Sequence, residues 1–205
     1  MVMTTAPPTD RQILDAAQYL MQVRGYNAFS YADIADQVGV RKATIHYHFQ
    51  SKAELARAVV ARYRVETRAM MAALDRETAD PRRRIERYIA LYEQMVHGGP
   101  RICLCAMLSA ETPTLPAAVQ AEVRGFFVDH EAWLGGVLEA AASAGALCRS
   151  GPNEGEARLL LAGIDGAMLA ARVHGDPARF DAVTRRLLAA VLPPAWGVAQ
   201  KSAGS

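Results

Sequence analysis

The chain has 205 residues and a formal net charge of +2, so it can bury a substantial core without being strongly basic or acidic. Three cysteines, an odd number, argue against a disulfide framework. No apolar run is long enough to span a bilayer and the N-terminus lacks a secretion signal, so we expect a cytoplasmic protein without a membrane partner. The charge is uneven: residues 1–65 carry eight Lys or Arg against five Asp or Glu, a net +3, which suits a nucleic-acid reader.

The first predicted helix begins at Thr9, after a disordered tail over residues 1–8. Thr9 and Gln12 have capping-box spacing, and Gly25 is the expected end of the helix. Between them an apolar stripe recurs at helical spacing. Its members are Ile13, Leu14, Ala17, Leu20 and Met21.

Residues 29–55 then predict two short helices, a tight turn and the start of a third helix. Ser30 can cap the first helix, and Gly39 stands where a left-handed residue ends it. In the second helix Ile45 and Phe49 are four residues apart and face inward, which leaves cationic and hydrogen-bonding side chains outside. This pattern indicates a helix-turn-helix, whose second helix fits the major groove of DNA.

The same segment resembles the DNA-binding domain of TetR/AcrR-type bacterial transcriptional regulators. The family pattern is matched by Ile34-Ala35, Gly39-Val40, Thr44, Tyr47-His48-Phe49, Ser51-Lys52 and Glu54-Leu55. The resemblance is specific over about residues 10–65 and concerns architecture beyond them. It implies a helix-turn-helix domain over residues 9–55, a helical effector-binding and dimerisation domain over 56–194, and a flexible tail over 195–205.

The rest of the chain is divided by proline and glycine as in an all-helical body. Ser51 and Glu54 open a long helix toward Leu74, and Asp80-Pro81 opens the next. Further helices are expected over residues 102–110, 117–144, 153–174 and 176–193. We therefore predict an all-α fold of nine or ten helices.

The residues expected to touch DNA fall into two roles. Arg41, Lys42 and Lys52 should neutralise phosphates, which sets affinity and salt dependence. Thr44 and His46 should reach base edges. The full set is Ser30, Tyr31, Arg41, Lys42, Ala43, Thr44, His46, Tyr47, His48 and Lys52.

The resemblance also implies a small-molecule effector inside the helical body, although methionines and aromatics at helical spacing are usually plain core. The candidate pocket residues are Tyr88, Tyr92, Met95, Cys103, Met107, Phe126, Phe127, His130, Trp133 and Met168.

Cys103 is in addition a candidate sensor thiol. It matches a cysteine through which some members of the family respond to electrophiles or oxidants, and Arg101 or a helix N-terminus could lower its pKa. The alternative is an inert, buried cysteine. No CxxC pair is present, so neither a metal nor a cofactor is expected.

Small residues among apolar ones indicate close helix packing over residues 154–174. By resemblance, this helix and the one over 117–144 should form a four-helix bundle with a second subunit; the alternative is packing within one chain. The expected interface residues are Leu160, Gly163, Ile164, Gly166, Ala167 and Ala170.

Three functions fit the sequence to different degrees. The first is a dimeric repressor that binds a palindromic operator and is released by a small apolar or electrophilic effector. The second is an effector-independent DNA-binding protein whose helical body binds a protein partner. The third, an enzyme on a helical bundle, is disfavoured because no phosphate loop, metal cluster or nucleophile constellation appears.

Overall fold

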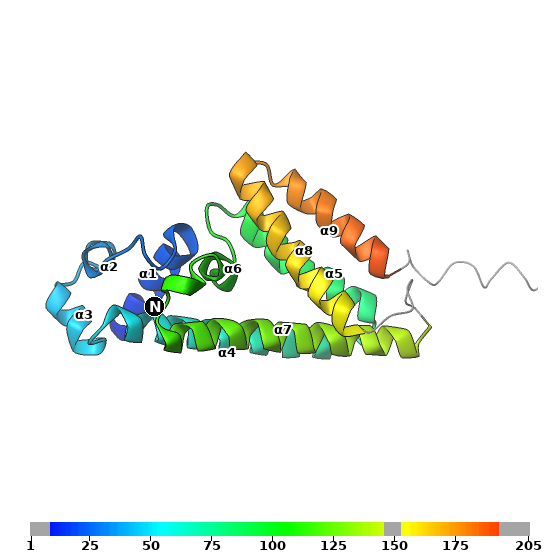
Figure 1. Cartoon of the computed structure of the whole chain (residues 1–205), viewed down its shortest axis with the longest axis horizontal. Helices are drawn as coiled ribbons and strands as arrows, with labels where there is room; N and C mark the ends of the chain where they lie inside the picture. Colours follow the sequence, from blue (N-terminus) through cyan, green and yellow to red (C-terminus); the bar gives the residue numbers. More distant parts are fainter. Residues whose placement is uncertain (1–8, 146–152, 193–205) are drawn as a thin grey trace, which may run out of the picture. The chain divides into compact units, whose positions relative to one another are not determined.

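The computed structural model describes residues 9–145 and 153–192, and every regular element in these ranges is helical (Figure 1). The predicted all-α class is therefore confirmed. The expected tails over residues 1–8 and 195–205 lie outside the described residues. None of the described helices is long and apolar enough to cross a membrane.

The chain divides into two compact units, which we call the head unit (residues 9–68 and 101–127) and the body unit (residues 69–100, 128–145 and 153–192). Two long helices, α4 (Lys52–Glu77) and α7 (Ala117–Ser143), contribute residues to both units. The remaining elements of the head unit are α1 (Thr9–Arg24), α2 (Tyr31–Val38), α3 (Lys42–His48), α6 (Leu104–Ser109) and the short 3-10 helix η1 (Thr112–Thr114).

The core of the head unit forms where α1 packs against α2, α3 and α6. The apolar stripe of α1 faces inward as its spacing predicted, and Ile13 and Met21 are fully buried. Ile34 and Ile45 bury the inner faces of the two short helices. The buried side-chain amide of Gln22 donates to the carbonyl of Ile102 at 3.1 Å, which ties the segment before α6 to α1.

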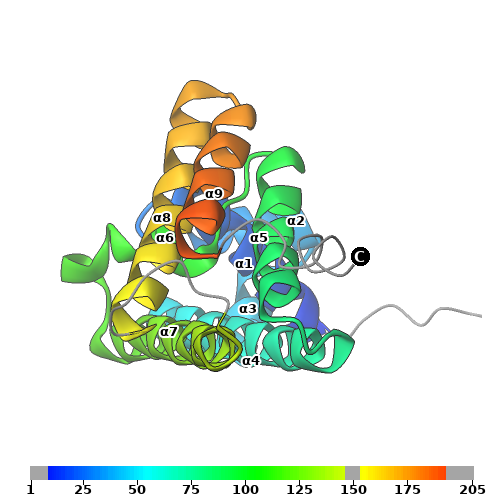
Figure 2. The ribbon, with the colours of Figure 1, turned by 90° about the vertical axis from the view of Figure 1, so that its right-hand side faces the viewer.

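The body unit is built on α5 (Pro81–His97), α8 (Asn153–His174) and α9 (Ala178–Val191). Asp80 caps α5 by accepting from the backbone N–H of Arg82, and Pro81 fills the first turn, where its missing N–H costs nothing. Helices α8 and α9 run side by side, and α5 packs against both (Figure 2). A Cβ at Gly163 would stand 2.4 Å from Leu187, so glycine allows this close approach of α8 to α9.

Candidate nucleic-acid interface and effector pocket

Helix α2 is fixed at its start by a reciprocal cap between Ser30 and Asp33. The Ser30 hydroxyl accepts from the backbone N–H of Ala32 at 3.2 Å, and the Asp33 carboxylate accepts from the Ser30 backbone N–H at 2.8 Å. The Ser30 hydroxyl, which donates to the Asp33 carboxylate at 2.7 Å, and the Ser30 backbone N–H lower the pKa of Asp33, and Arg24 at 3.1 Å lowers it further. The cap satisfies N–H groups that a short helix would otherwise leave unmatched.

The turn that follows sets the direction of α3. Gly39 adopts the left-handed conformation at φ 76°, and the N–H groups of Gly39 and Val40 both return to the Ala35 carbonyl. A side chain at Gly39 would be strained there, because L-residues rarely adopt this φ. The chain therefore enters α3 with Ile45 inward, and the predicted helix-turn-helix is confirmed.

The outer surface of α3 carries most of the residues expected to meet DNA. Tyr47 is 85% exposed, and its ring packs edge-on against His48 at 5.3 Å. Thr44 and His48 are half-buried at the sides of the helix. The exposed members of the predicted set are Ser30, Arg41, Lys42, Ala43, His46 and Tyr47.

A hollow of about 400 Å³ lies between the start of α2 and α3. Ser30 and Tyr31 form its α2 side, and Lys42 and His46 form its α3 side. Beside the capped start of α2, the hollow brings together the Lys42 ammonium group and the His46 imidazole, which are side chains suited to contact a phosphate group.

Tyr31 and Lys52 also hold the head unit together, a role that spacing did not predict. The Tyr31 hydroxyl donates to the carbonyl of Phe49, the residue that ends α3, at 2.9 Å. Burial raises the pKa of Tyr31 to about 12. The Lys52 ammonium donates to the Phe29 carbonyl at 2.5 Å and lies 4.2 Å from the centre of the Phe29 ring. Burial lowers the pKa of Lys52.

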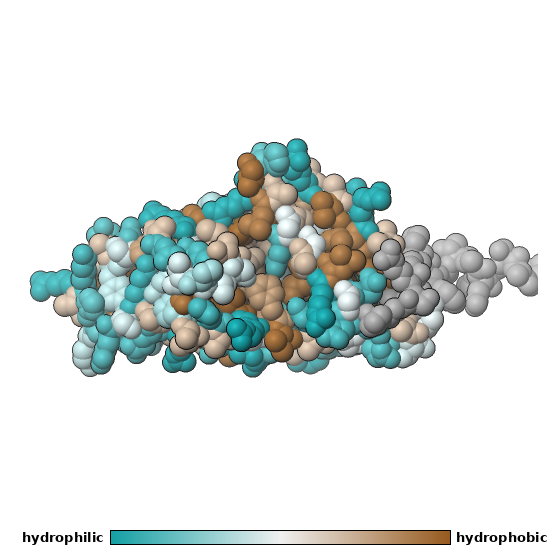
Figure 3. Space-filling model, in the orientation of Figure 1, coloured by the Kyte–Doolittle hydropathy of each residue, from teal (hydrophilic) through white to brown (hydrophobic). Residues whose placement is uncertain are grey.

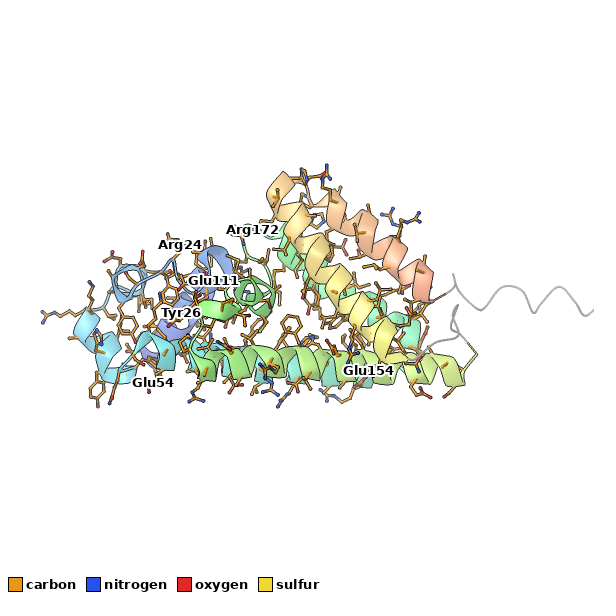
Figure 4. The ribbon with its side chains drawn as sticks, viewed as in Figure 1. Arg24, Tyr26, Glu54, Glu111, Glu154 and Arg172 are labelled. Carbon is orange, nitrogen blue, oxygen red and sulfur yellow. The ribbon has the colours of Figure 1, made fainter. Side chains whose placement is uncertain are left out.

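Glu111, which follows α6, anchors the loop between α1 and α2, a role that the sequence did not predict. Its carboxylate accepts from the backbone N–H of Tyr26 at 2.5 Å and from the backbone and side-chain N–H groups of Asn27 at 3.3 and 3.1 Å (Figure 4). The carboxylate also lies against Gly25, where a Cβ would be 2.8 Å from its oxygens. A lone glutamate in a Ser-Ala-Glu segment gives no sequence signal for this contact.

Four of the residues predicted for the effector pocket cluster inside the body unit. The Tyr88 hydroxyl lies 2.7 Å from His130 Nδ1 and 3.0 Å from the Tyr92 hydroxyl. The Trp133 ring lies 5.2 Å from the Tyr88 ring, and its N–H donates to Asp75. Burial lowers the pKa of His130 to about 4, so the imidazole is neutral at physiological pH. Met168 is also fully buried in this unit, and Met95 is half-buried.

The other four predicted pocket residues belong to the head unit. Cys103 is fully buried, and the Tyr63 hydroxyl is 3.7 Å from its sulfur. Tyr63 stacks on Phe126 at 5.8 Å, and burial, with Cys103 next in effect, raises the pKa of Tyr63 well above its usual value. Phe126 packs edge-on against Phe127, and Phe127 and Met107 are half-buried.

The six predicted interface residues lie on different sides of α8. Leu160, Ile164 and Ala167 are buried inside the body unit, and Gly163 faces Leu187 of α9. Gly166 is exposed and Ala170 is half-buried. Leu159, Leu169 and Val173 of α8 are 44%, 44% and 81% exposed. Hydrophobic side chains gather over α8 on the face shown in Figure 3.

Comparison with known proteins covers both parts of the chain. Residues 13–59 match the family model "Bacterial regulatory proteins, tetR family", and residues 81–187 match "Tetracyclin repressor-like, C-terminal domain". The chain is similar to a TetR-family transcriptional regulator from Agrobacterium tumefaciens, with 40% identity, a TM-score of 0.87, and coverage of 89% of this chain and 97% of the other.

Two further similarities are narrower. The transcriptional regulator TtgR of Pseudomonas putida is 40% identical over 55 residues, which are 27% of this chain and 26% of that protein. A regulator from Saccharomonospora viridis, solved in complex with choline, is 24% identical, with a TM-score of 0.74 and coverage of 87% and 92%, and is alike in fold.

Proposed function

Because the chain belongs to the TetR family of bacterial transcriptional regulators, we propose that it is a repressor that binds a palindromic operator as a homodimer and releases it on binding a small effector. The observation that carries the proposal is the exposed surface of α3, which presents Lys42, His46 and Tyr47 on a helix-turn-helix with both ends of α2 capped. In this arrangement residues 9–55 read DNA, and residues 56–194 bind the effector and the second subunit.

Within the DNA-reading surface the residues divide by chemistry. Lys42 and Arg41 are exposed cations that contact phosphates, and the positive end of the α2 dipole lies beside the hollow next to Lys42. His46 and Thr44 read base edges, and Ala43 lets the backbone of α3 approach the groove. Tyr31 and Lys52 position these groups, since their polar atoms already bind backbone carbonyls.

The apolar face of α8 supports a dimer. Leu159, Leu169 and Val173 recur at helical spacing on this face, and the small residue Gly166 between them lets a second helix approach. A two-fold axis through this face would pair two chains, and their two α3 helices could then read two half-sites about one helical turn of DNA apart.

The effector site rests on the buried polar cluster of the body unit. Tyr88, Tyr92 and His130 place hydroxyl and neutral imidazole groups among apolar side chains, a setting that orients a small, mostly apolar ligand. An electrophilic effector would have to reach Cys103, which is buried, so its reaction requires movement of the segment that carries α6. Effector binding releases DNA only if it favours a conformation with lower operator affinity.

The proposal is tested by measuring binding to duplex DNA from upstream of the gene as a function of salt. We expect sequence-specific binding. The slope of log affinity against log salt concentration should fall by about one in Lys42→Gln. His46→Ala should leave that slope unchanged but lose about 1–3 kcal/mol of the preference for the operator over other sequences. Arg83→Gln on α5 is the matched control, because it removes an exposed charge of the body unit. Equal effects of Lys42→Gln and Arg83→Gln would contradict the proposed surface.

A further inference from the structure

A cluster of three metal-ligating side chains lies on the outer part of the body unit, apart from the groups used above. Glu93 and His97 are four residues apart on α5 and therefore share one face of that helix. Asp181 belongs to the first turn of α9. One ligand atom from each of the three residues lies within 4.8 Å of the other two.

We propose that Glu93, His97 and Asp181 form a binding site for a divalent transition-metal ion of the Zn²⁺ type, which links α5 to α9. This site goes beyond the proposed regulatory function and does not depend on it. Residue spacing did not predict this site, because its ligands come from two helices more than 80 residues apart.

One pair of ligand atoms already has the spacing that a tetrahedral ion requires. Metal–ligand bonds of about 2.0–2.2 Å to nitrogen and oxygen place neighbouring ligand atoms roughly 3.3–3.6 Å apart. The distance between His97 Nε2 and Asp181 Oδ1 is 3.3 Å, so one edge of the tetrahedron already has the required length. The limit of 4.8 Å on the other pairs means that a small rotation of the exposed Glu93 side chain completes the set.

Charge and exposure also favour an ion. The two carboxylates offer negative charge that a divalent cation balances, and the imidazole offers a ring nitrogen as a ligand. His97 is the last residue of α5, and the negative end of the helix dipole favours a cation there. The His97 and Asp181 side chains are 48% and 27% exposed, so water can supply the fourth ligand.

The donor set also selects among metals. Mg²⁺ and Ca²⁺ prefer six or more oxygen ligands, whereas imidazole with carboxylates suits Zn²⁺, Co²⁺ and Ni²⁺. The competing explanation is a plain ion pair between His97 and Asp181, which requires a protonated imidazole and gives no role to Glu93. Metal binding instead requires all three side chains, and this difference makes the two explanations separable.

The experiment is titration of the metal-free full-length protein with Zn²⁺ by calorimetry, together with thermal unfolding at each metal concentration. We expect one Zn²⁺ per chain and a rise in Tm of about 5–10 °C at a hundredfold excess over Kd, with no shift in Mg²⁺. Co²⁺ in place of Zn²⁺ should give the absorption of a four-coordinate ion. Absence of Zn²⁺ binding, or an equal shift with Mg²⁺, would overturn the proposal.

Variants identify the ligands. His97→Ala, Glu93→Gln and Asp181→Asn should each lower the affinity for Zn²⁺ at least tenfold. Glu93 and His97 are exposed, and Asp181→Asn keeps the shape of a half-buried side chain, so each variant should keep the fold. His174→Ala is the matched control, since it removes an exposed histidine at the end of another helix, α8. Cys148→Ser controls for binding by that thiol, which lies outside the described residues. Zn²⁺ binding that survives His97→Ala, or that is lost in either control, refutes the site.

Discussion

Replacing Glu111 with alanine removes an acceptor that three donors of Tyr26 and Asn27 share. The bond from the Tyr26 backbone N–H, at 2.5 Å, belongs to a half-buried residue, whereas Asn27 is exposed. Water can therefore replace the carboxylate at Asn27 more easily than at Tyr26. The change should loosen the loop between α1 and α2, directly before the Ser30 cap.

The expected loss follows from these contacts. A hydrogen bond to a charged acceptor contributes about 1.5–3 kcal/mol, and a backbone N–H left without its acceptor carries a desolvation cost in the same range. We assign the full cost to the half-buried Tyr26 N–H and little to the exposed Asn27 donors, so we expect Glu111→Ala to lower the free energy of unfolding by about 2–3 kcal/mol. Glu111→Gln keeps one carbonyl acceptor and should lose about 1 kcal/mol.

The measurement is urea denaturation followed by circular dichroism, at one fixed protein concentration because dimerisation would shift the midpoint. Thr114→Ala is the matched control, since Thr114 accepts one bond from the exposed Asn27 side chain at 2.8 Å and should lose less than about 0.5 kcal/mol. A Glu111→Ala protein as stable as the Thr114→Ala protein would show that the anchor contributes nothing.

Three further predictions concern buried or partly buried charges. Burial lowers the pKa of His130 from 6.5 to about 4, so the unfolded chain binds this proton at a higher pH than the folded chain does. The free energy of unfolding should therefore fall by about 3 kcal/mol as the pH drops from 6.5 to 4. In urea denaturation, His130→Gln should lack this part of the pH dependence. Burial raises the pKa of Asp165 to about 7, and its buried Oδ1 has no hydrogen-bond partner. The folded state therefore favours the protonated carboxyl, and the stability that this proton contributes is complete below pH 4 and is lost as the pH rises through 7. Asp165→Asn should therefore raise the free energy of unfolding by about 2–4 kcal/mol above pH 7 and change it little at pH 4. Lys52→Gln should lower the free energy of unfolding by about 1–2 kcal/mol and leave the salt slope of DNA binding unchanged. A slope that falls as it does in Lys42→Gln would instead show that Lys52 contacts a phosphate.

Local signals in the sequence predicted the fold well because the helices begin and end at residues with a defined backbone role. Ser30, Gly39 and Pro81 each act within one turn of the chain, so their effect can be read without the tertiary structure. The apolar stripe of α1 similarly predicted its buried face. The helix-turn-helix followed from such local rules, and the exposed face of α3 followed from the inward position of Ile45.

The contacts of Lys52 and Glu111 could not be predicted in this way. A lysine at a helix start is normally solvated, and only the approach of Phe29 gives its ammonium a carbonyl and an aromatic face. The anchor by Glu111 joins residues 84 and 85 positions apart, a pairing that no periodic pattern encodes. On α8, spacing identified a helix rich in small residues but did not separate the face toward α9 from the exposed face.

The position of Trp133 makes the body unit optically observable. The chain has two tryptophans, and Trp196→Phe would leave Trp133 as the sole indole emitter. Its ring is 5.2 Å from Tyr88, which touches His130, and its N–H binds Asp75. A ligand that displaces Tyr88 or breaks the bond to Asp75 would change the polarity around the indole, so its emission spectrum would report occupancy of the cluster without any attached dye.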